Sequence, residues 1–169
     1  MRYKTAPGPV ELVGVDALGS THSALPLVPE TVDDCCARVV ERTAVPSRDD
    51  AREWITFLEA LGLAEETSRG YRRVRGTLAP EALAEPFTEN VFAVAELLSA
   101  LETGESQSVG EAFDTLRPTI PEWERDRHAD WEAVWTDRVE RLLAWAAAFG
   151  LAVREDGRYR QSSVGGPTG

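Results

Sequence analysis

The chain has 169 residues, of which 43% are hydrophobic, so it is long enough for one sizeable core or two small ones. Its formal net charge is -11, yet Lys4 is the only lysine and the other seventeen basic residues are arginines. The two cysteines are adjacent and cannot staple a small secreted fold, and the longest uncharged apolar stretch, residues 142–153, is too short to span a bilayer. We therefore expect a cytoplasmic protein that is neither secreted nor inserted in a membrane.

The first 28 residues are rich in residues that interrupt regular structure. Between residues 5 and 28, scattered valines and leucines are separated by Pro7, Gly8, Pro9, Gly14, Gly19 and Pro26. Proline and glycine are the strongest local signals for turns and loops. We expect residues 1–28 to form an irregular or short-stranded arm.

Two helices are predicted between residues 31 and 62. From Thr31 onward apolar residues recur at helical spacing, and Asp33 and Asp34 lie in the first turn, where carboxylates favour the positive end of the helix dipole. This pattern predicts a helix over about 31–43. After a proline-marked break, Ser47 can cap a second helix that Gly62 ends. The apolar face of the second helix is predicted to carry Trp54, Phe57, Leu58 and Leu61.

A short hairpin is predicted to follow the second helix. Residues 63–67 and 71–75 flank the turn-forming segment Ser68, Arg69 and Gly70. The order helix, three-residue turn, helix and hairpin is that of a helix-turn-helix followed by a wing. Residues 29–78 are therefore predicted to be a first winged-helix-like unit.

The second half is predicted to contain a similar unit over residues 88–161, reached through a link at 76–87 that contains Pro80 and Pro86. Its expected elements are a helix at 88–102, a short helix behind a capping box of Ser108 and Glu111, a helix at 130–149 and a hairpin of 151–155 with 158–161. The apolar stripe of its first helix would be Val91, Val94, Ala95, Leu98 and Leu101. Residues 162–169 are expected to be a disordered tail.

An internal repeat links the two predicted units. Gly62 and Gly150 are 88 residues apart, and Tyr71 and Tyr159 each lie nine residues after their glycine. At the same offset Phe57 aligns with Trp145. A helix, a glycine stop and a tyrosine-bearing hairpin thus recur in phase, which indicates that one structural device is used twice.

These segments carry a family resemblance. The run from Val45-Pro46-Ser47 to Gly62-Leu63, followed by Gly70-Tyr71-Arg72, resembles the recognition helix and wing of winged helix-turn-helix proteins, a group dominated by prokaryotic transcription regulators. The resemblance covers residues 31–75 and, less cleanly, 89–161. It implies a mainly α fold with short β-hairpins (α+β), arranged as tandem winged-helix-like units. The acidic, lysine-poor composition resembles that of proteins from salt-loving archaea.

One departure from the winged-helix pattern concerns the first unit, in which no helix is predicted before residue 31. Winged helices usually begin with such a helix. The core would then be completed by the arm, by the helix at 89–102, or by a second subunit.

The candidate DNA-binding residues are arginines, because binding requires cations at phosphate distance. They are Arg48 and Arg52, one turn apart on the second helix, and Arg69, Arg72, Arg73 and Arg75 of the first hairpin. On the same helix, Asp49, Asp50, Glu53 and Glu59 would oppose DNA if they share the outward face with Arg48 and Arg52. The alternative is that the hairpin arginines only solubilise an exposed hairpin.

The acidic second half suggests a different partner. Residues 81–169 hold eight basic and seventeen acidic side chains, and residues 76–116 hold eight acids and no base. We expect double-stranded DNA to be bound by the first unit, with the second serving for homodimerisation or for another protein. The rival hypothesis is a winged-helix protein-interaction module with no nucleic-acid role. No cofactor, metal site or enzymatic activity is predicted, because no phosphate-binding glycine loop, zinc signature or nucleophile elbow occurs.

The paired thiols admit two interpretations. Cys35 and Cys36 could sense metals or oxidants, as neighbouring cysteines do in some regulators. They also fall on the apolar stripe with Val32 and Val39, where cysteine is a common small core residue. We expect packing to be their role.

Overall fold

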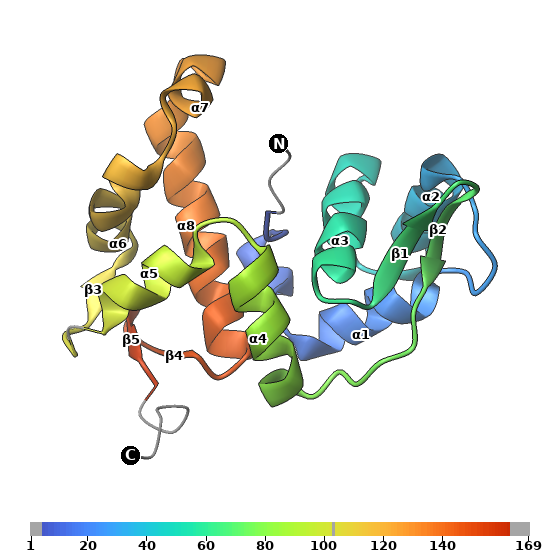
Figure 1. Ribbon diagram of the computed structural model, residues 1–169, viewed down its shortest axis with the longest axis horizontal. Helices are drawn as coiled ribbons and strands as arrows, with labels where there is room; N and C mark the ends of the chain where they lie inside the picture. The colour runs from blue at the N-terminus through green and yellow to red at the C-terminus, as the bar shows by residue number, and fades with distance from the viewer. Residues whose placement is uncertain (1–4, 103, 163–169) are drawn as a thin grey trace. The chain divides into compact units, whose positions relative to one another are not determined.

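The computed structural model describes residues 5–102 and 104–162 (Figure 1). The chain divides into two compact units, residues 1–92 and 93–169. Both are mainly helical, and each carries a small antiparallel sheet, which confirms the predicted α+β class. In the described residues, no helix combines the length and the hydropathy needed to cross a membrane.

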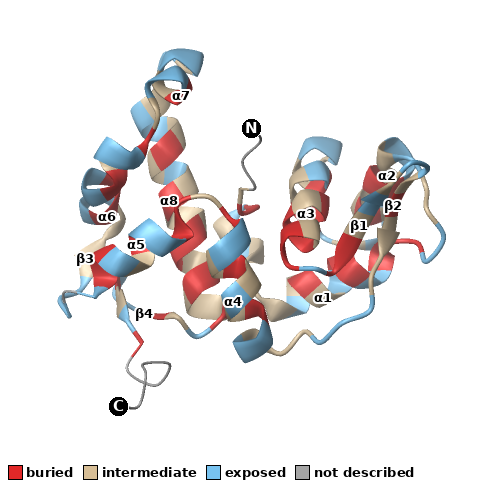
Figure 2. Ribbon diagram, in the orientation of Figure 1, coloured by how far each residue is buried: buried red, intermediate tan, exposed pale blue. Residues whose placement is uncertain are grey.

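The first unit contains the predicted helix-turn-helix and hairpin. Its elements are the 3-10 turn η1 (Val10–Leu12), α1 (Val15–Ala24), α2 (Val32–Arg42), α3 (Arg48–Ala60), β1 (Ala64–Thr67), β2 (Gly70–Arg73) and α4 (Pro80–Asn90). The hydroxyls of Thr31 and Ser47 cap α2 and α3 by accepting the N–H groups of Asp34 and Asp50. All four apolar residues predicted for the inner face of α3 are buried (Figure 2).

The prediction of an irregular arm is wrong for residues 15–24, which form α1. This helix supplies the missing first helix and packs on α2 and α3. Its buried residues are Leu18, Thr21, His22 and Ala24, of which two are polar, so the apolar periodicity is hidden in the sequence. Both polar groups are satisfied: the Thr21 hydroxyl donates to Ala17 O at 2.9 Å, and His22 Nε2 lies 2.8 Å from Val74 O.

The predicted link at 76–87 is wrong, and the helix predicted at 88–102 is confirmed only over residues 94–101. Residues 80–90 form α4, with Pro80 in its first turn and Pro86 inside it. A proline inside a helix costs one backbone hydrogen bond, but α4 buries Leu83 and Phe87, and the Phe87 ring meets Phe57 of α3 edge-on at 6.1 Å. The chain then breaks at Ala93, whose φ is 71°, and α4 stays with the first unit.

The second unit contains α5 (Val94–Leu101), β3 (Gln107–Ser108), α6 (Val109–Leu116), η2 (Arg117–Thr119), α7 (Glu122–Arg127), α8 (Trp131–Ala148), β4 (Ala152–Glu155) and β5 (Arg158–Gln161). The capping box is confirmed at the start of α6, where Ser108 and Glu111 satisfy each other's backbone N–H groups. Because α5 begins only at residue 94, Leu97 is buried while Ala95 is exposed, which corrects the predicted stripe. The expected disordered tail lies outside the described residues except for Ser162, which is buried.

The predicted repeat is confirmed in three dimensions. Gly62 and Gly150 both have φ 79°, and each ends its helix with the same pair of backbone hydrogen bonds. The N–H that follows the glycine donates across the helix end at 2.8 Å in both cases, from Leu63 to Leu58 O and from Leu151 to Ala146 O. Strand registers match as well, since Ala64 pairs with Arg73 in one hairpin and Ala152 with Gln161 in the other.

A third strand position joins each hairpin and was not predicted. Tyr71 pairs with Glu30 in an isolated bridge, and Tyr159 pairs with Gln107 of β3. With α7 of the second unit and α4 at the end of the first set aside, both units therefore run helix, strand position, helix, helix, strand, strand. The repeated tyrosines, 6% and 1% exposed, mark where the segment after the first helix joins the hairpin.

Candidate nucleic-acid interface

The exposed face of α3 presents two of the candidate arginines beside carboxylates. Arg48 and Arg52 are exposed, and Asp49 is exposed next to them. Glu59 lies eleven residues after Arg48, about three helical turns, and therefore falls on the same stripe. Asp50 is held by the Ser47 hydroxyl at 2.8 Å. The outward face of α3 is thus mixed in charge, which reduces the attraction of phosphate to this helix.

The four hairpin arginines have different surroundings. Arg69 at the turn and Arg75 beyond β2 are exposed. Arg72 forms an ion pair across the hairpin with Glu65. Arg73 is half-buried and turns inward, so the structure does not bring all four to one cationic surface.

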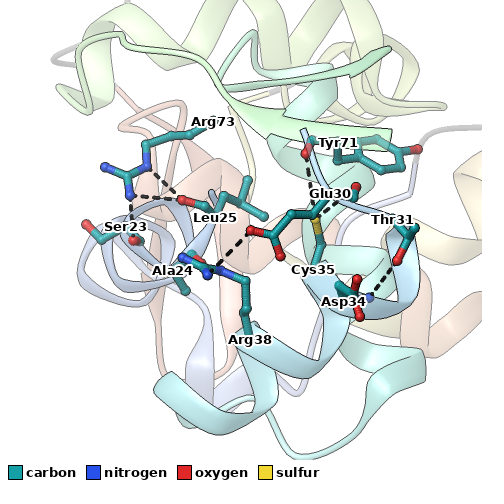
Figure 3. Close-up of polar contacts among 10 residues, drawn as sticks. All are labelled: Ser23, Ala24, Leu25, Glu30, Thr31, Asp34, Cys35, Arg38, Tyr71 and Arg73. Atoms are coloured by element: carbon teal, nitrogen blue, oxygen red, sulfur yellow. Dashed lines mark hydrogen bonds and ion pairs between the residues drawn. The ribbon is translucent and has the colours of Figure 1, made fainter. Parts of the chain in front are cut away.

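Arg73 binds the carboxyl end of α1 (Figure 3). Its guanidinium donates to Leu25 O at 2.9 and 3.1 Å and to Ser23 O at 2.9 Å. Arg38 of α2 donates from Nε to Ala24 O at 3.0 Å. Two cations therefore satisfy the last carbonyls of α1, where the helix dipole is negative. Arg73 fastens α1 to the hairpin and is poorly placed for phosphate.

The two cysteines, Cys35 and Cys36 of α2, are buried free thiols. Burial raises the pKa of Cys35 to about 11, and the nearby Glu30 carboxylate adds to the rise. Burial also raises the pKa of Cys36, against the opposing effect of Arg52. Both thiols are therefore neutral at physiological pH, as expected of packing residues. In the described residues, no cluster of three or more histidine, cysteine or acidic side chains could hold a metal ion.

The two units differ in how their arginines are paired. The structure describes eight arginines in each unit. Among the eight described arginines of the first unit, only Arg38 and Arg72 form ion pairs with described carboxylates. In the second unit six do so: Arg117, Arg127, Arg138, Arg141, Arg158 and Arg160. Arg48, Arg52, Arg69 and Arg75 make no ion pair with any described residue, so the first unit keeps accessible positive charge despite its acids.

The helix of the second unit that corresponds to α3 has a different surface. The last thirteen residues of α8 match α3, which places Thr136 and Glu140 at the positions of Arg48 and Arg52. The additional helix α7 packs on α8 through Glu124, which is 1% exposed and bonds to Arg138 at 2.9 Å. Sequence reasoning missed α7, because six residues are too few to show a helical period. At these two positions α8 carries no cation, and its arginines Arg138 and Arg141 are held in ion pairs with Glu124 and Asp137.

Comparison with known proteins identifies the family. No curated protein and no solved structure matches the chain. The family model described as the halobacterial double winged helix domain matches residues 1–165. That match agrees with the repeated order of elements and with the acidic, arginine-rich composition typical of a halophilic-archaeal protein. The chain therefore belongs to the halobacterial double winged helix family.

Proposed function

We propose that this protein binds double-stranded DNA through its first unit and regulates transcription. The observation that carries the proposal is the contrast in ion pairing: two of eight described arginines are paired in the first unit and six of eight in the second. A paired guanidinium must lose its carboxylate before it can bind phosphate. An unpaired one only exchanges water and counterions.

The proposed contacts are Arg48 and Arg52 of α3 with Arg69 and Arg75 of the hairpin region. Arg72 and Arg73, expected from the sequence to contact DNA, instead support the hairpin in this proposal. Four phosphate contacts give a slope of log K against log salt of about -3.6. Such binding is weak in concentrated salt, so a homodimer that doubles the contacts fits the proposal better than a monomer does.

The test compares equivalent hairpins within one molecule. The double variant Arg69→Gln/Arg75→Gln removes two proposed contacts, and the matched control Arg154→Gln/Arg160→Gln removes the same charge from the second hairpin. Fluorescence anisotropy with a labelled duplex is measured in potassium chloride, over the range in which circular dichroism shows both variants folded. We expect the salt slope to become shallower by about 1.8 in the first variant only. Equal slopes for both variants would refute the assignment.

Genome-wide crosslinking of the tagged protein in its native salt tests the regulatory part of the proposal. Discrete peaks in the parent that disappear with Arg69→Gln/Arg75→Gln support regulation at defined sites. Binding in vitro without discrete peaks would retain DNA binding and reject regulation.

A second candidate is a protein-interaction module that uses the acidic second unit. The observation in its favour is Trp123 on α7, a tryptophan that is 49% exposed in a helix rich in charge. Large exposed aromatic residues are enriched at protein interfaces. Absence of DNA binding by the parent, together with recovery of a protein partner that Trp123→Ala loses, would favour this candidate.

A further inference from the structure

A cavity in the first unit lies between α1 and the turn that joins α2 to α3. Its volume is about 310 Å³, at the small end of the range for small-molecule pockets. Leu12 of η1 and Ala17 of α1 form apolar walls, and Ala44 and Val45 of the turn complete them. The walls can enclose a compact apolar group.

The lining of the cavity also includes polar residues. Ser20, Thr21 and Thr43 contribute hydroxyls, and among the described residues Arg42 is the one charged residue in the lining. Ser20 and Arg42 also line an adjoining, more open hollow of about 490 Å³. Arg42 therefore borders both spaces.

The hydroxyl donors are already used by the backbone. Thr21 donates to Ala17 O at 2.9 Å, Thr43 to Val39 O at 2.7 Å, and Ser20 to Asp16 O at 3.1 Å. Arg42, in contrast, forms no ion pair or side-chain hydrogen bond with any described residue, although the chain contains 29 acids. The strongest donor that the cavity offers a ligand is thus a guanidinium, which binds a carboxylate in a two-bond geometry.

We propose that this cavity binds a small organic monoanion with a compact apolar body, of the size of an aromatic or short-chain carboxylate. The carboxylate lies on Arg42 and the apolar body lies against Leu12, Ala17 and Val45. A polyol lacks a charge for Arg42, and a polyanion would face a single cation. A ligand here contacts Thr43, Ala44 and Val45, the turn that orients α3. Through this turn a bound ligand would change the affinity of α3 for DNA, and that effect rests on the proposed function. Binding of the ligand itself does not depend on DNA binding.

Benzoate is the probe, with benzamide as its neutral isostere. Each is titrated into the ¹⁵N-labelled full chain, without DNA, in potassium chloride at a concentration that keeps the protein folded. We expect benzoate to produce saturable shifts at the amides of Ser20, Thr43 and Val45, and benzamide to bind at least about tenfold more weakly. Equal affinity for both compounds, or no shift at these amides at millimolar benzoate, overturns the proposal.

Three variants distinguish the contribution of the Arg42 charge to benzoate binding from the contribution of the space in the cavity. Arg42→Gln should weaken benzoate binding by at least about tenfold, whereas Arg154→Gln, which removes the same charge from the second unit, should leave it unchanged. Ala17→Leu enlarges an apolar side chain of the lining and should abolish binding while Arg42 remains. Unchanged affinity in Arg42→Gln or Ala17→Leu, with the spectrum of a folded protein, overturns the site. Because no DNA is present, failure here is distinguishable from failure of DNA binding.

Discussion

Gly70 is the position at which one added methyl group should do most damage to the first unit. Its φ is 123°, and a Cβ placed on it would lie 1.9 Å from the Glu30 carbonyl oxygen. That carbonyl accepts the Tyr71 N–H at 2.8 Å, and the Glu30 N–H donates to Tyr71 O at 3.1 Å. Gly70→Ala therefore acts on the bridge that joins the third strand to the hairpin.

The cost follows from the geometry. Relief of the clash to 3.0 Å requires a movement of at least about 1 Å, which stretches the shorter hydrogen bond to about 3.9 Å and breaks it. Loss of two backbone hydrogen bonds costs about 1 kcal/mol each. An alanine that keeps the positive φ adds about 1–3 kcal/mol. We expect a loss of about 3–5 kcal/mol, a large part of the stability of a small domain.

The matched control is Gly62→Ala in the same unit. Gly62 has φ 79°, and an added Cβ would meet no atom within 4 Å, so only the left-handed backbone is penalised, by about 1–2 kcal/mol. Hydrogen exchange measured by mass spectrometry gives the exchange rates of peptides from α2 and α3 separately from those of the second unit. The reasoning fails if the amides of α2 and α3 exchange no faster in Gly70→Ala than in Gly62→Ala. It also fails if the amides of Glu30 and Tyr71 stay protected in Gly70→Ala.

Three further predictions concern charge and the thiols. Arg73→Gln removes the donors that hold the end of α1 and should cost about 1.5–3 kcal/mol in thermal unfolding, against less than about 0.5 kcal/mol for Arg69→Gln; equal costs would contradict the inward role of Arg73. Asp49→Asn removes an acid from the outward face of α3 and should tighten duplex binding several-fold in anisotropy, and unchanged affinity would place DNA elsewhere. The thiols should react with Ellman's reagent at pH 8 only after unfolding. Because burial raises the pKa of Cys35 from 9.0 to about 11, the unfolded thiol ionises first, so stability should fall between pH 9 and 11; a flat profile would contradict this.

Where the sequence patterns were complete, they predicted the local structure correctly. The caps at Thr31, Ser47 and Ser108 each combine a hydroxyl with a helical apolar period, and each begins a helix. Gly62 and Gly150 were identified as helix ends from their place after an apolar face. These features depend on neighbours a few residues away.

The errors occur where distant contacts override local preference. Residues 80–90 contain two prolines and still form α4, because Phe87 packs on Phe57 thirty residues earlier. The inner face of α1 contains Thr21 and His22, whose polar atoms find backbone partners only in the folded unit. Hydrophobic periodicity cannot reveal a helix whose buried face is half polar.

In the candidate site, too, the sequence predicts local features but not those that depend on distant contacts. Arginine count and spacing identified the hairpin region, but they could not distinguish Arg73, which binds the carbonyls of α1, from Arg69, which remains exposed. The ion pairs Arg138–Glu124 and Arg158–Glu111 and the cavity beside Arg42 have no sequence signature, because each joins residues from separate elements.

The sequence by itself determined the helix ends, the two hairpins and their repetition, since these follow from capping, periodicity and glycine conformation over short distances. Only the tertiary structure decided which helices complete each core, where the third strands join and which guanidinium groups stay accessible. Those outcomes depend on burial and on pairing between residues far apart in the chain, and the free energy of such contacts exists only once the units have folded.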